Sequence, residues 1–398
     1  MKHDTHEALK NPGRFRLPGW YYPAAGVLAL SGFGVFGWCL STDPHRAWGG
    51  YLIGFYATLI LALAGPFFVA AQYLAGAGWS VSVRRIPEAM SAFLLPAAAL
   101  SVGVFVGAHH LYHWAHPGVV EEDLLLLHKA PYLNITRMGV AVAVGFAVWI
   151  GLSTLISANS RAQDSSGDAK LTHRNALLSA LFMVLFALTF SVASFDFVMS
   201  LEPHWFSTMW AVYMFSMMMQ VGMAFIAMAV SLLRKTGQLD GFVHDAHVHD
   251  LGKFAFAFAA FHAYIAFCQF LLIWYANLPE ETIFFIKRFD HGWQWVALAL
   301  PFVKFMVPFF VLLPWRAKHT GPVLVGVGVW TLLVTTLELW WLVMPALTTH
   351  GPELPWIEFA IFGGFFGIFL LAFGFALSRH AAVPVKDPRL AEAVHHHL

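Results

Sequence analysis

Charged residues are scarce in this chain of 398 residues. Asp, Glu, Lys and Arg together make up 11% of it, whereas soluble globular proteins carry about 25%. The formal net charge is only +1, which argues against nucleic acid as a partner. Hydrophobic residues account for 59% of the sequence. This balance indicates a polytopic membrane protein.

Cysteine is almost absent, and the motifs of common cofactor sites are missing. Cys39 and Cys268 lie in apolar runs and in none of the spacings of zinc, iron–sulfur or covalent haem sites. The sequence has no P-loop, no nucleotide-binding glycine loop after a strand and no G-x-S-x-G motif. We therefore expect no catalytic residue, no metal site and no covalently bound cofactor, and a colourless protein when the chain is isolated.

What the sequence does contain is ten apolar runs, each of about 20 residues or more and so able to cross a hydrocarbon core of ~30 Å. Backbone polar groups cannot be left unpaired in lipid, so each run must be a helix. The runs cover residues 20–40, 48–77, 88–112, 134–157, 175–201, 205–233, 251–277, 291–313, 321–347 and 356–378. The prediction is an all-α polytopic membrane protein with ten transmembrane helices, forming one integral membrane domain over residues 1–398.

The basic residues and the gap lengths predict how the spans are arranged. Of the 23 Lys and Arg residues, 17 lie in the terminal segments and in the gaps after even-numbered spans. Basic segments stay in the cytoplasm, so both termini are predicted to be cytoplasmic, and the first span is interpreted as retained rather than cleaved. One short turn separates spans two to five from spans six to nine, which favours two four-helix bundles with the first and last helices beside them. The polar gap 158–174 is expected to be a flexible linker, and Gly363, Gly364 and Gly367 a helix-packing face.

The segment Ser194–Trp210, which joins spans five and six, places a carboxylate at membrane depth. Asp196 lies near the outer third of its predicted helix, where a carboxylate costs at least ~2.5 kcal/mol. Glu202 begins a predicted tight turn that ends at Trp205. Helical spacing places on the face of Asp196 the small or polar residues Thr189, Ala193 and Ser200, which suit a water-lined crevice. Asp196 is therefore either a structural carboxylate bonded to a neighbouring helix or a group that handles protons or contacts a quinone.

Histidines gather at the outer end of span three. His109, His110 and His113 could bind a quinone carbonyl, ligate a metal, shuttle protons or simply lie among lipid headgroups, and His109 and His113 should share a helical face. His262 is the one histidine predicted to lie deep in a span. Its level differs from that of His109 and His110 by ~15 Å, too far for one iron, so haem is not expected.

Two charged residues lie within spans eight and nine, which form a hairpin. Lys304 and Glu338 are offset by about 9 Å along the hairpin, a separation that two long side chains can bridge. They form either an ion pair that holds the bundle together or an element of a proton relay.

Two histidine-rich tracts look like metal sites but are not predicted to be such sites. The tract His244–Asp250 is expected to lie in a solvated loop without a second cluster of ligands. The tract His395–His397 is expected to be a polar tail.

Several motifs carry a resemblance to a known family. Besides Ser194–Trp210, they are Trp79–Glu88, His110–Trp114, His128–Asn134 and Trp274–Glu281. With ten spans and both ends inside, the chain resembles the polysulfide-reductase-type (NrfD-like) membrane subunits. Within them it is most similar to the ActF subunits of bacterial alternative complex III, the quinone-binding subunit 2 of these quinol:cytochrome c oxidoreductases.

The resemblance implies a respiratory role in the bacterial inner membrane. The implied partners are a second ten-span NrfD-like subunit, an iron–sulfur subunit, c-type cytochrome subunits, a terminal oxidase and membrane lipids, and the quinol would be menaquinol or ubiquinol. Proton translocation and scaffolding are expected of this subunit, with a quinone pocket conceivable near Asp196 and His110. The residues for these tasks are Asp196, with Glu202, His109, His110, His113, His262, Lys304 and Glu338 as further candidates.

Other functions are compatible with ten spans. Buried charges and the helix-breaking residues Pro96, Pro301 and Pro308 permit a secondary transporter, although no matched pair of interrupted spans is evident. A purely structural membrane anchor is a second alternative. A haem-copper oxidase core would need more histidines within the spans.

Overall fold

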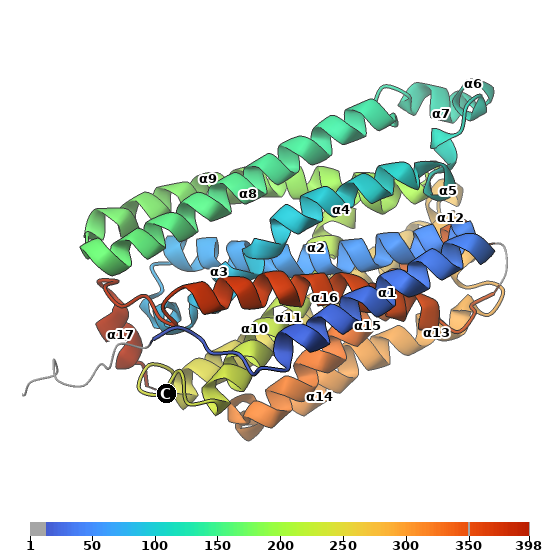
Figure 1. Ribbon diagram of the computed structural model, residues 1–398. Helices are drawn as coiled ribbons and strands as arrows, with labels where there is room; N and C mark the ends of the chain where they lie inside the picture. Colours follow the sequence, from blue (N-terminus) through green and yellow to red (C-terminus); the bar gives the residue numbers. More distant parts are fainter. Residues whose placement is uncertain (1–12, 349–350, 398) are drawn as a thin grey trace, which may run out of the picture.

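The computed structural model describes residues 13–348 and 351–397, which fold into helices joined by short loops, with no strand among them. Within these residues, ten helical stretches are long and apolar enough to cross a membrane, which confirms the predicted fold class. Figure 1 shows the long helices running side by side, with the short helices gathered at their two ends.

The ten spans follow each other in chain order, and two of them are interrupted. They are α1 (Tyr21–Thr42), α2 (Pro44–Leu74), α3 (Arg85–Met90) continued by η2 (Ser91–Phe93) and α4 (Leu94–Val106), α8 (Ile135–Ser166), α9 (Ala169–Phe197), α10 (Trp210–Lys235), α11 (Asp245–Ala276), α13 (Trp293–Leu300) continued by η5 (Pro301–Met306) and α14 (Val307–Leu312), α15 (Gly321–Leu347) and α16 (Trp356–Arg379). The shorter elements are η1 (Gly78–Val83), α5 (Ala108–Leu111), η3 (His113–Ala115), α6 (Val119–Glu122), α7 (Leu124–Lys129), η4 (Met199–Leu201), α12 (Pro279–Arg288), η6 (Trp315–His319) and α17 (Leu390–Val394).

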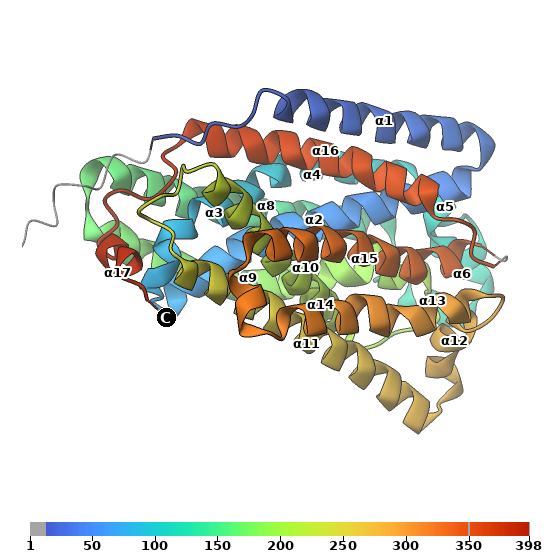
Figure 2. The ribbon, with the colours of Figure 1, turned by 90° about the horizontal axis from the view of Figure 1, so that it is seen from below.

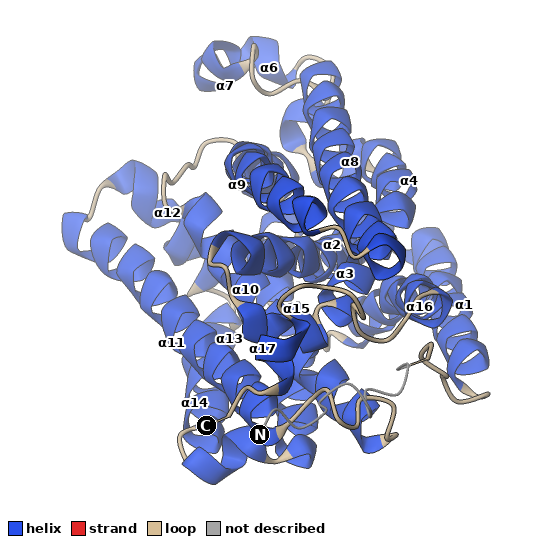
Figure 3. Ribbon diagram, turned by 90° about the vertical axis from the view of Figure 1, so that its left-hand side faces the viewer, coloured by secondary structure: helices blue, strands red, loops and turns tan. Residues whose placement is uncertain are grey.

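Two helices, α2 and α10, occupy the centre of the molecule. Each is 94% buried over its most apolar stretch. Helix α2 forms a ring of four with α4, α8 and α9, and α10 forms a second ring with α11, α15 and the α13–α14 span (Figure 3). Gly222 lets the two central helices touch, because a Cβ there would lie 2.1 Å from the Cβ of Ala64. The predicted pair of four-helix bundles is therefore present, joined through α2 and α10.

The first and last spans pack on each other and against α2 (Figure 2). Their contact depends on glycine, because a Cβ on Gly32 would lie 2.3 Å from the backbone nitrogen of Gly364. A Cβ on Gly367 would likewise lie 2.5 Å from the backbone nitrogen of Ala29. The glycines of α16 thus form the packing face that the sequence predicted.

The polar gap 158–174 is not a flexible linker, and that prediction is wrong. Helix α8 continues to Ser166, and only Gly167 and Asp168 separate it from α9. Gly167 ends α8 in the left-handed region, with φ at +67°, and the Asp168 carboxylate accepts a bond from Lys170 N to begin α9. The polar side chains bond to each other across the hairpin, as Gln163 Nε2 does to Thr172 Oγ1 at 2.8 Å.

Both described ends of the chain lie at the same end of the bundle, the end that carries α17 (Figure 1). Ala382 N donates to Gly13 O at 2.9 Å, which ties the carboxyl-terminal segment to the amino-terminal one. The opposite end carries α5–α7 and α12. Residues 1–12, 349–350 and 398 lie outside the described part of the chain, including most of the polar amino-terminal segment.

The excess of Lys and Arg at the α17 end predicts which side of the membrane this end occupies. Reporter fusions after residue 398 and before residue 1 should both report a cytoplasmic location. The measurement is the activity of a phosphatase that works only in the periplasm, fused at each end. A fusion between α6 and α7 is the matched control and should be active. An active phosphatase at either terminus would contradict the topology.

Candidate functional site

Four polar side chains from four different spans meet at membrane depth. Glu338 of α15 lies 2.8 Å from Lys304 Nζ through Oε2 and 3.0 Å from His262 Nε2 through Oε1, and Oε1 also accepts the hydroxyl of Tyr213. None of the four residues is more than 5% exposed. The direct Lys304–Glu338 pair confirms the prediction from the hairpin, and the depth predicted for His262 is also confirmed. We call Tyr213, His262, Lys304 and Glu338 the Glu338 cluster.

Both ring nitrogens of His262 have polar partners. Nε2 donates to Glu338, because a carboxylate only accepts. Nδ1 lies 2.9 Å from the hydroxyl of Ser216, which also donates to Tyr213 O at 2.7 Å. Hydrogen bonds therefore connect the Glu338 cluster through the imidazole to Ser216 on α10.

Lys304 lies in η5, a π-helical turn between two prolines. Pro308 has no N–H, so the carbonyls four and five residues before it lose a backbone donor. Side chains replace that donor, because Gln220 Nε2 bonds to Lys304 O at 3.0 Å and Trp330 Nε1 bonds to Val303 O at 2.7 Å. Lys304 Nζ also donates to Thr335 Oγ1 at 2.7 Å. Side chains of neighbouring helices thus form hydrogen bonds with the irregular turn. Turns of this π-helical kind often occur at functional sites.

A cavity of about 660 Å³ adjoins the Glu338 cluster. Its walls come from α10, α11, α12, α15 and the α13–η5 segment, and all four cluster residues line it. The remaining lining is mostly apolar, and its polar groups are the amide of Gln269, the hydroxyl of Tyr264 and the indole N–H groups of Trp210 and Trp341. The volume lies within the range of small-molecule sites. No sequence motif predicts this cavity, although Pro301 and Pro308 indicate the irregular span beside it.

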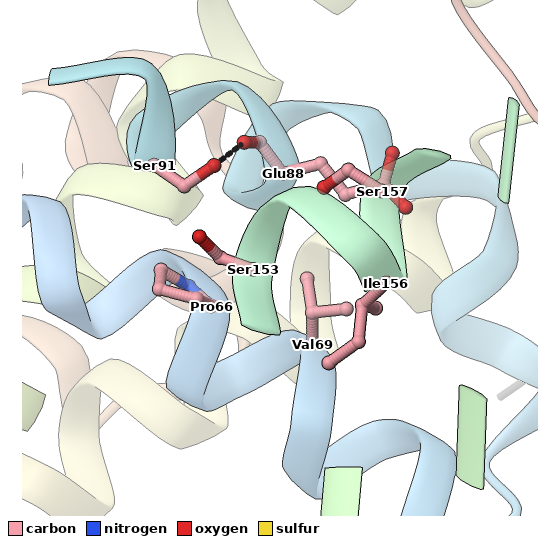
Figure 4. A pocket seen from close by; sticks show the side chains of 7 residues that line it. All are labelled: Pro66, Val69, Glu88, Ser91, Ser153, Ile156 and Ser157. Atoms are coloured by element: carbon pink, nitrogen blue, oxygen red, sulfur yellow. Dashed lines mark hydrogen bonds between the residues drawn. The ribbon is translucent and has the colours of Figure 1, made fainter. Parts of the chain in front are cut away.

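A second cavity lies in the other bundle and is far smaller (Figure 4). Its volume is about 10 Å³, room for about one water molecule. Ser91 donates to the carbonyl of Glu88 at 2.7 Å on its wall, and Arg85 Nη1 lies 2.7 Å from Glu88 Oε2. The lining residues are Pro66, Val69, Glu88, Ser91, Ser153, Ile156 and Ser157. This space is a packing gap rather than a ligand site.

Asp196 is buried near the end of α9, as predicted, and its partner is an arginine. Both its oxygens accept from Arg137 of α8, at 2.7 Å from Nη1 and 2.8 Å from Nη2. Arg137 is itself placed by Tyr132, whose carbonyl accepts from Nε at 2.7 Å and whose ring lies 3.7 Å below the guanidinium. A guanidinium keeps its proton in proteins, so this pair fixes charge instead of exchanging it. The geometry favours the structural interpretation of Asp196.

Neighbouring side chains fill the face of α9 that was expected to border a crevice. Thr189 accepts from Trp149 Nε1 at 2.9 Å, and Ser200 donates to the carbonyl of Asp196 at 2.6 Å. The indole of Trp114 bonds to Ser200 O at 3.0 Å. Because each polar group has a protein partner, this face is a packed contact between spans. Neither cavity described above is lined by Asp196 or His110.

The histidines at the end of span three do not lie on one continuous helix, so that prediction is wrong. Helix α4 ends at Val106, and Tyr112 is extended between α5 and η3. Gly107 marks the break, because a Cβ there would lie 2.4 Å from the indole of Trp48. His109 and His113 are exposed. His110 packs against His45, with the centroids of the two rings 5.0 Å apart. Partial burial and the neighbouring imidazole lower the pKa of His110, which keeps its ring neutral at physiological pH.

Glu202 lies outside the large cavity and bonds to two basic residues of α12. Its carboxylate lies 3.1 Å from Arg288 Nη1 and 3.5 Å from Lys287 Nζ. Arg288 is buried and also donates to Leu342 O at 2.6 Å. Burial lowers the pKa of Arg288 to about 10, so it stays charged at neutral pH. Glu202 is thus joined to a cavity wall through Arg288, a link that sequence spacing could not reveal.

The turn that contains Glu202 is longer than predicted, because α10 begins at Trp210 and not at Trp205. The side chain of Trp205 is held outside the helix instead. Its ring stacks on Phe284 with centroids 4.1 Å apart, and its Nε1 donates to Glu281 O at 3.0 Å. These contacts fasten the segment between spans five and six onto α12.

The histidine tract His244–Asp250 is not a solvated loop, which corrects the prediction. It forms the first turns of α11, and His247 and His249 are buried. The carboxyl-terminal tract does not extend freely either, because His396 Nε2 lies 2.7 Å from Asp250 Oδ2. Among residues 13–348 and 351–397, no group of three or more His, Cys, Asp or Glu side chains is placed to hold a metal ion.

The Glu338 cluster combines a carboxylate, an ammonium, an imidazole and a phenol in the membrane interior, next to a cavity that can take a ligand. These groups can accept, donate and pass on protons. No family model and no curated protein matches this chain. The motifs of the sequence and the chemistry of this site are therefore what indicates a function for the chain.

Proposed function

We propose that the chain is an integral membrane subunit of a quinol:cytochrome c oxidoreductase of the alternative complex III type, in a bacterial inner membrane. Its tasks are to scaffold the complex and to take part in proton translocation through the Glu338 cluster. The motifs that resemble the ActF subunits support the type of complex. The observation that carries the proposal is the direct contact of Glu338 with both Lys304 and His262 at membrane depth.

A purely structural role explains this cluster poorly. Taking two charges out of water costs several kcal/mol per ion. A protein in which a buried ion pair is replaced by two apolar side chains of similar size is often equally stable. The molecule already has structural ion pairs built with arginine, at Asp196 and at Glu358, whose Oε1 lies 2.8 Å from Arg46 Nε. The Glu338 cluster differs because lysine, histidine and tyrosine can each change protonation. Such groups suit a proton-loading site.

The proposed partners follow from the same resemblance. A second ten-span NrfD-like subunit would lie beside this one in lipid, and the iron–sulfur and c-type cytochrome subunits would cover the outer face, with a terminal oxidase as a further partner. The chain supplies no electron carrier in this proposal. Electrons from menaquinol or ubiquinol would pass through the partners, while protons pass through the membrane subunits.

A secondary transporter is the alternative that one observation favours, since an interrupted span borders a large cavity. Purification distinguishes the two functions. A tagged chain in its native membrane should co-purify with haem-bearing partners and with quinol:cytochrome c activity, and the same chain expressed alone should be colourless. A chain that purifies alone from its native membrane, without quinol oxidation, would contradict the proposal.

A further inference from the structure

The large cavity opens toward the lipid rather than toward water. Tyr264 and Phe267 of α11 line it and are 62% and 59% exposed, and Leu298 of α13 lines it and is 52% exposed. On helices that cross a membrane, large exposed side chains of this kind, apolar apart from the hydroxyl of Tyr264, contact acyl chains. A ligand that reaches the cavity past these side chains of α11 and α13 therefore comes from the bilayer. This route excludes water-soluble charged metabolites.

The interior of the cavity suits a flat ring. Phe270, Phe284 and Phe305 line it, together with the rings of Trp210 and Tyr213. Aromatic side chains stack on flat rings and gain more than their buried area alone provides. An acyl chain alone would gain less from such a lining.

Two buried polar atoms point to the hydrogen-bonding pattern of the ligand. Gln269 and Trp341 line the cavity and are only 4% and 7% exposed. Gln269 Oε1, an acceptor, and Trp341 Nε1, a donor, have no hydrogen-bond partner among the residues that the structure describes. A buried polar group without a partner costs about 1–3 kcal/mol, so a purely apolar occupant would leave that cost in place. The ligand should both donate and accept.

The polar groups lie far enough apart to meet both ends of one ring. Gln269 is seven residues after His262, two turns along the same face of α11 and about 10 Å in rise. His262 belongs to the Glu338 cluster, so one end of the ligand would meet the cluster and the other Gln269. This requires oxygen atoms on opposite sides of a ring.

We propose that this cavity binds an isoprenoid quinone in its quinone and quinol forms, with the tail leaving between α11 and α13. The carbonyl oxygens would accept from Trp341 and from the cluster, and the hydroxyls of the quinol would donate to Gln269. The choice of a quinone among ring-bearing lipids rests on the proposed function. The site is distinct from the region of Asp196 and His110, where the sequence suggested a quinone pocket.

The test uses the purified complex in phospholipid vesicles and a photoreactive azidoquinone. Cross-links should map to α11 and to the α13–η5 segment, and unlabelled quinone should compete with them. Ala297→Trp fills the cavity, whereas Ala299→Trp is the matched control, because Ala299 is exposed on the same helix and does not line the cavity. We expect Ala297→Trp to lose labelling at least about tenfold and Ala299→Trp to keep it. Equal labelling of the two variants would overturn the proposal.

A second pair of variants tests the unpartnered polar groups and does not depend on filling the cavity. Gln269→Leu and Trp341→Phe should each weaken competition by unlabelled quinone about tenfold, the loss expected for one hydrogen bond. Unchanged competition in both variants would overturn the assigned contacts, even if Ala297→Trp failed to fold. Phospholipid recovered from the cavity in place of quinone would also overturn the proposal.

The results separate this inference from the proposed function. Labelling of α11 in a chain that has no haem-bearing partners would support the quinone site and contradict the respiratory complex. A complex that oxidises quinol without any labelling of α11 or α13 would support the complex and contradict the site.

Discussion

Glutamine in place of Glu338 is expected to abolish proton movement by the complex. The substitution keeps the shape of the side chain but removes the one carboxylate that contacts both Lys304 and His262. Positioned proton-transfer groups contribute about 10²–10⁴-fold to rate, so proton release should fall by at least about 100-fold, or quinol turnover should fall with it. The measurement is quinol oxidation and proton release by the complex in sealed vesicles.

Loss of the charge on Glu338 also leaves Lys304 without its counter-charge, which can cost about 3–5 kcal/mol. The double variant Glu338→Gln with Lys304→Met removes both charges and should assemble normally while still failing to move protons. Arg46→Met with Glu358→Gln is the matched control, since it removes another buried carboxylate and its basic partner away from the cavity, and the second carboxylate paired with Arg46, that of Glu353, is exposed. Wild-type proton release in an assembled Glu338→Gln complex would show that the cluster is structural.

Removal of Arg137 from the Asp196–Arg137 pair is expected to destabilise the chain by about 3–5 kcal/mol, and removal of Asp196 is expected to cost less. Asp196 is 1% exposed and has two charge-assisted bonds to one guanidinium, so loss of Arg137 leaves a buried carboxylate unpaired, whereas the side chain of Arg137 is 25% exposed and can reach water. The double variant Asp196→Asn with Arg137→Met should recover part of the loss, with a coupling energy of about 0.5–3 kcal/mol. The measurement is unfolding of the purified chain in detergent, carried out as a double-mutant cycle.

The same variants decide between the two interpretations of Asp196. If Asp196 is structural, an assembled Asp196→Asn complex should match the wild type in quinol oxidation and in proton release. If Asp196 handles protons, turnover should fall or lose its coupling to proton movement even where the complex is intact. Additive losses in the cycle, without coupling, would contradict the pairing with Arg137.

The Lys304–Glu338 contact was predictable because both residues lie in one hairpin. A short connection places two antiparallel helices side by side, and counting from its centre gives the relative depth of any two residues. Nothing similar ties His262 or Tyr213 to this pair. They lie on other helices, and which face of α11 or α10 turns toward α15 is decided by packing alone.

For Asp196 as well, the sequence predicts the position in the membrane but not the partner. The helix that contains Asp196 and the depth of this residue follow from the apolar run. In the sequence, Arg137 is only one of the basic residues at the edges of spans, and nothing marks it as the partner of Asp196. The pairing needs α8 and α9 to run antiparallel with Arg137 and Asp196 at the same level. The helical extension over residues 158–166 and the interruption at Gly107 likewise depend on contacts with other spans. The sequence identifies the candidate residues of a functional site, but it does not show which of these residues contact each other.

The amino-acid sequence by itself determined the ten helices, because lipid leaves no alternative pairing for backbone groups and the apolar runs mark where lipid lies. It also determined the depths of Asp196, Lys304 and Glu338 within their spans. Only the tertiary structure decided the partners and the cavity. Lipid tails are as apolar as the side chains that face them, so hydrophobicity does not select which helices touch, and small residues and polar contacts make that choice across the whole fold.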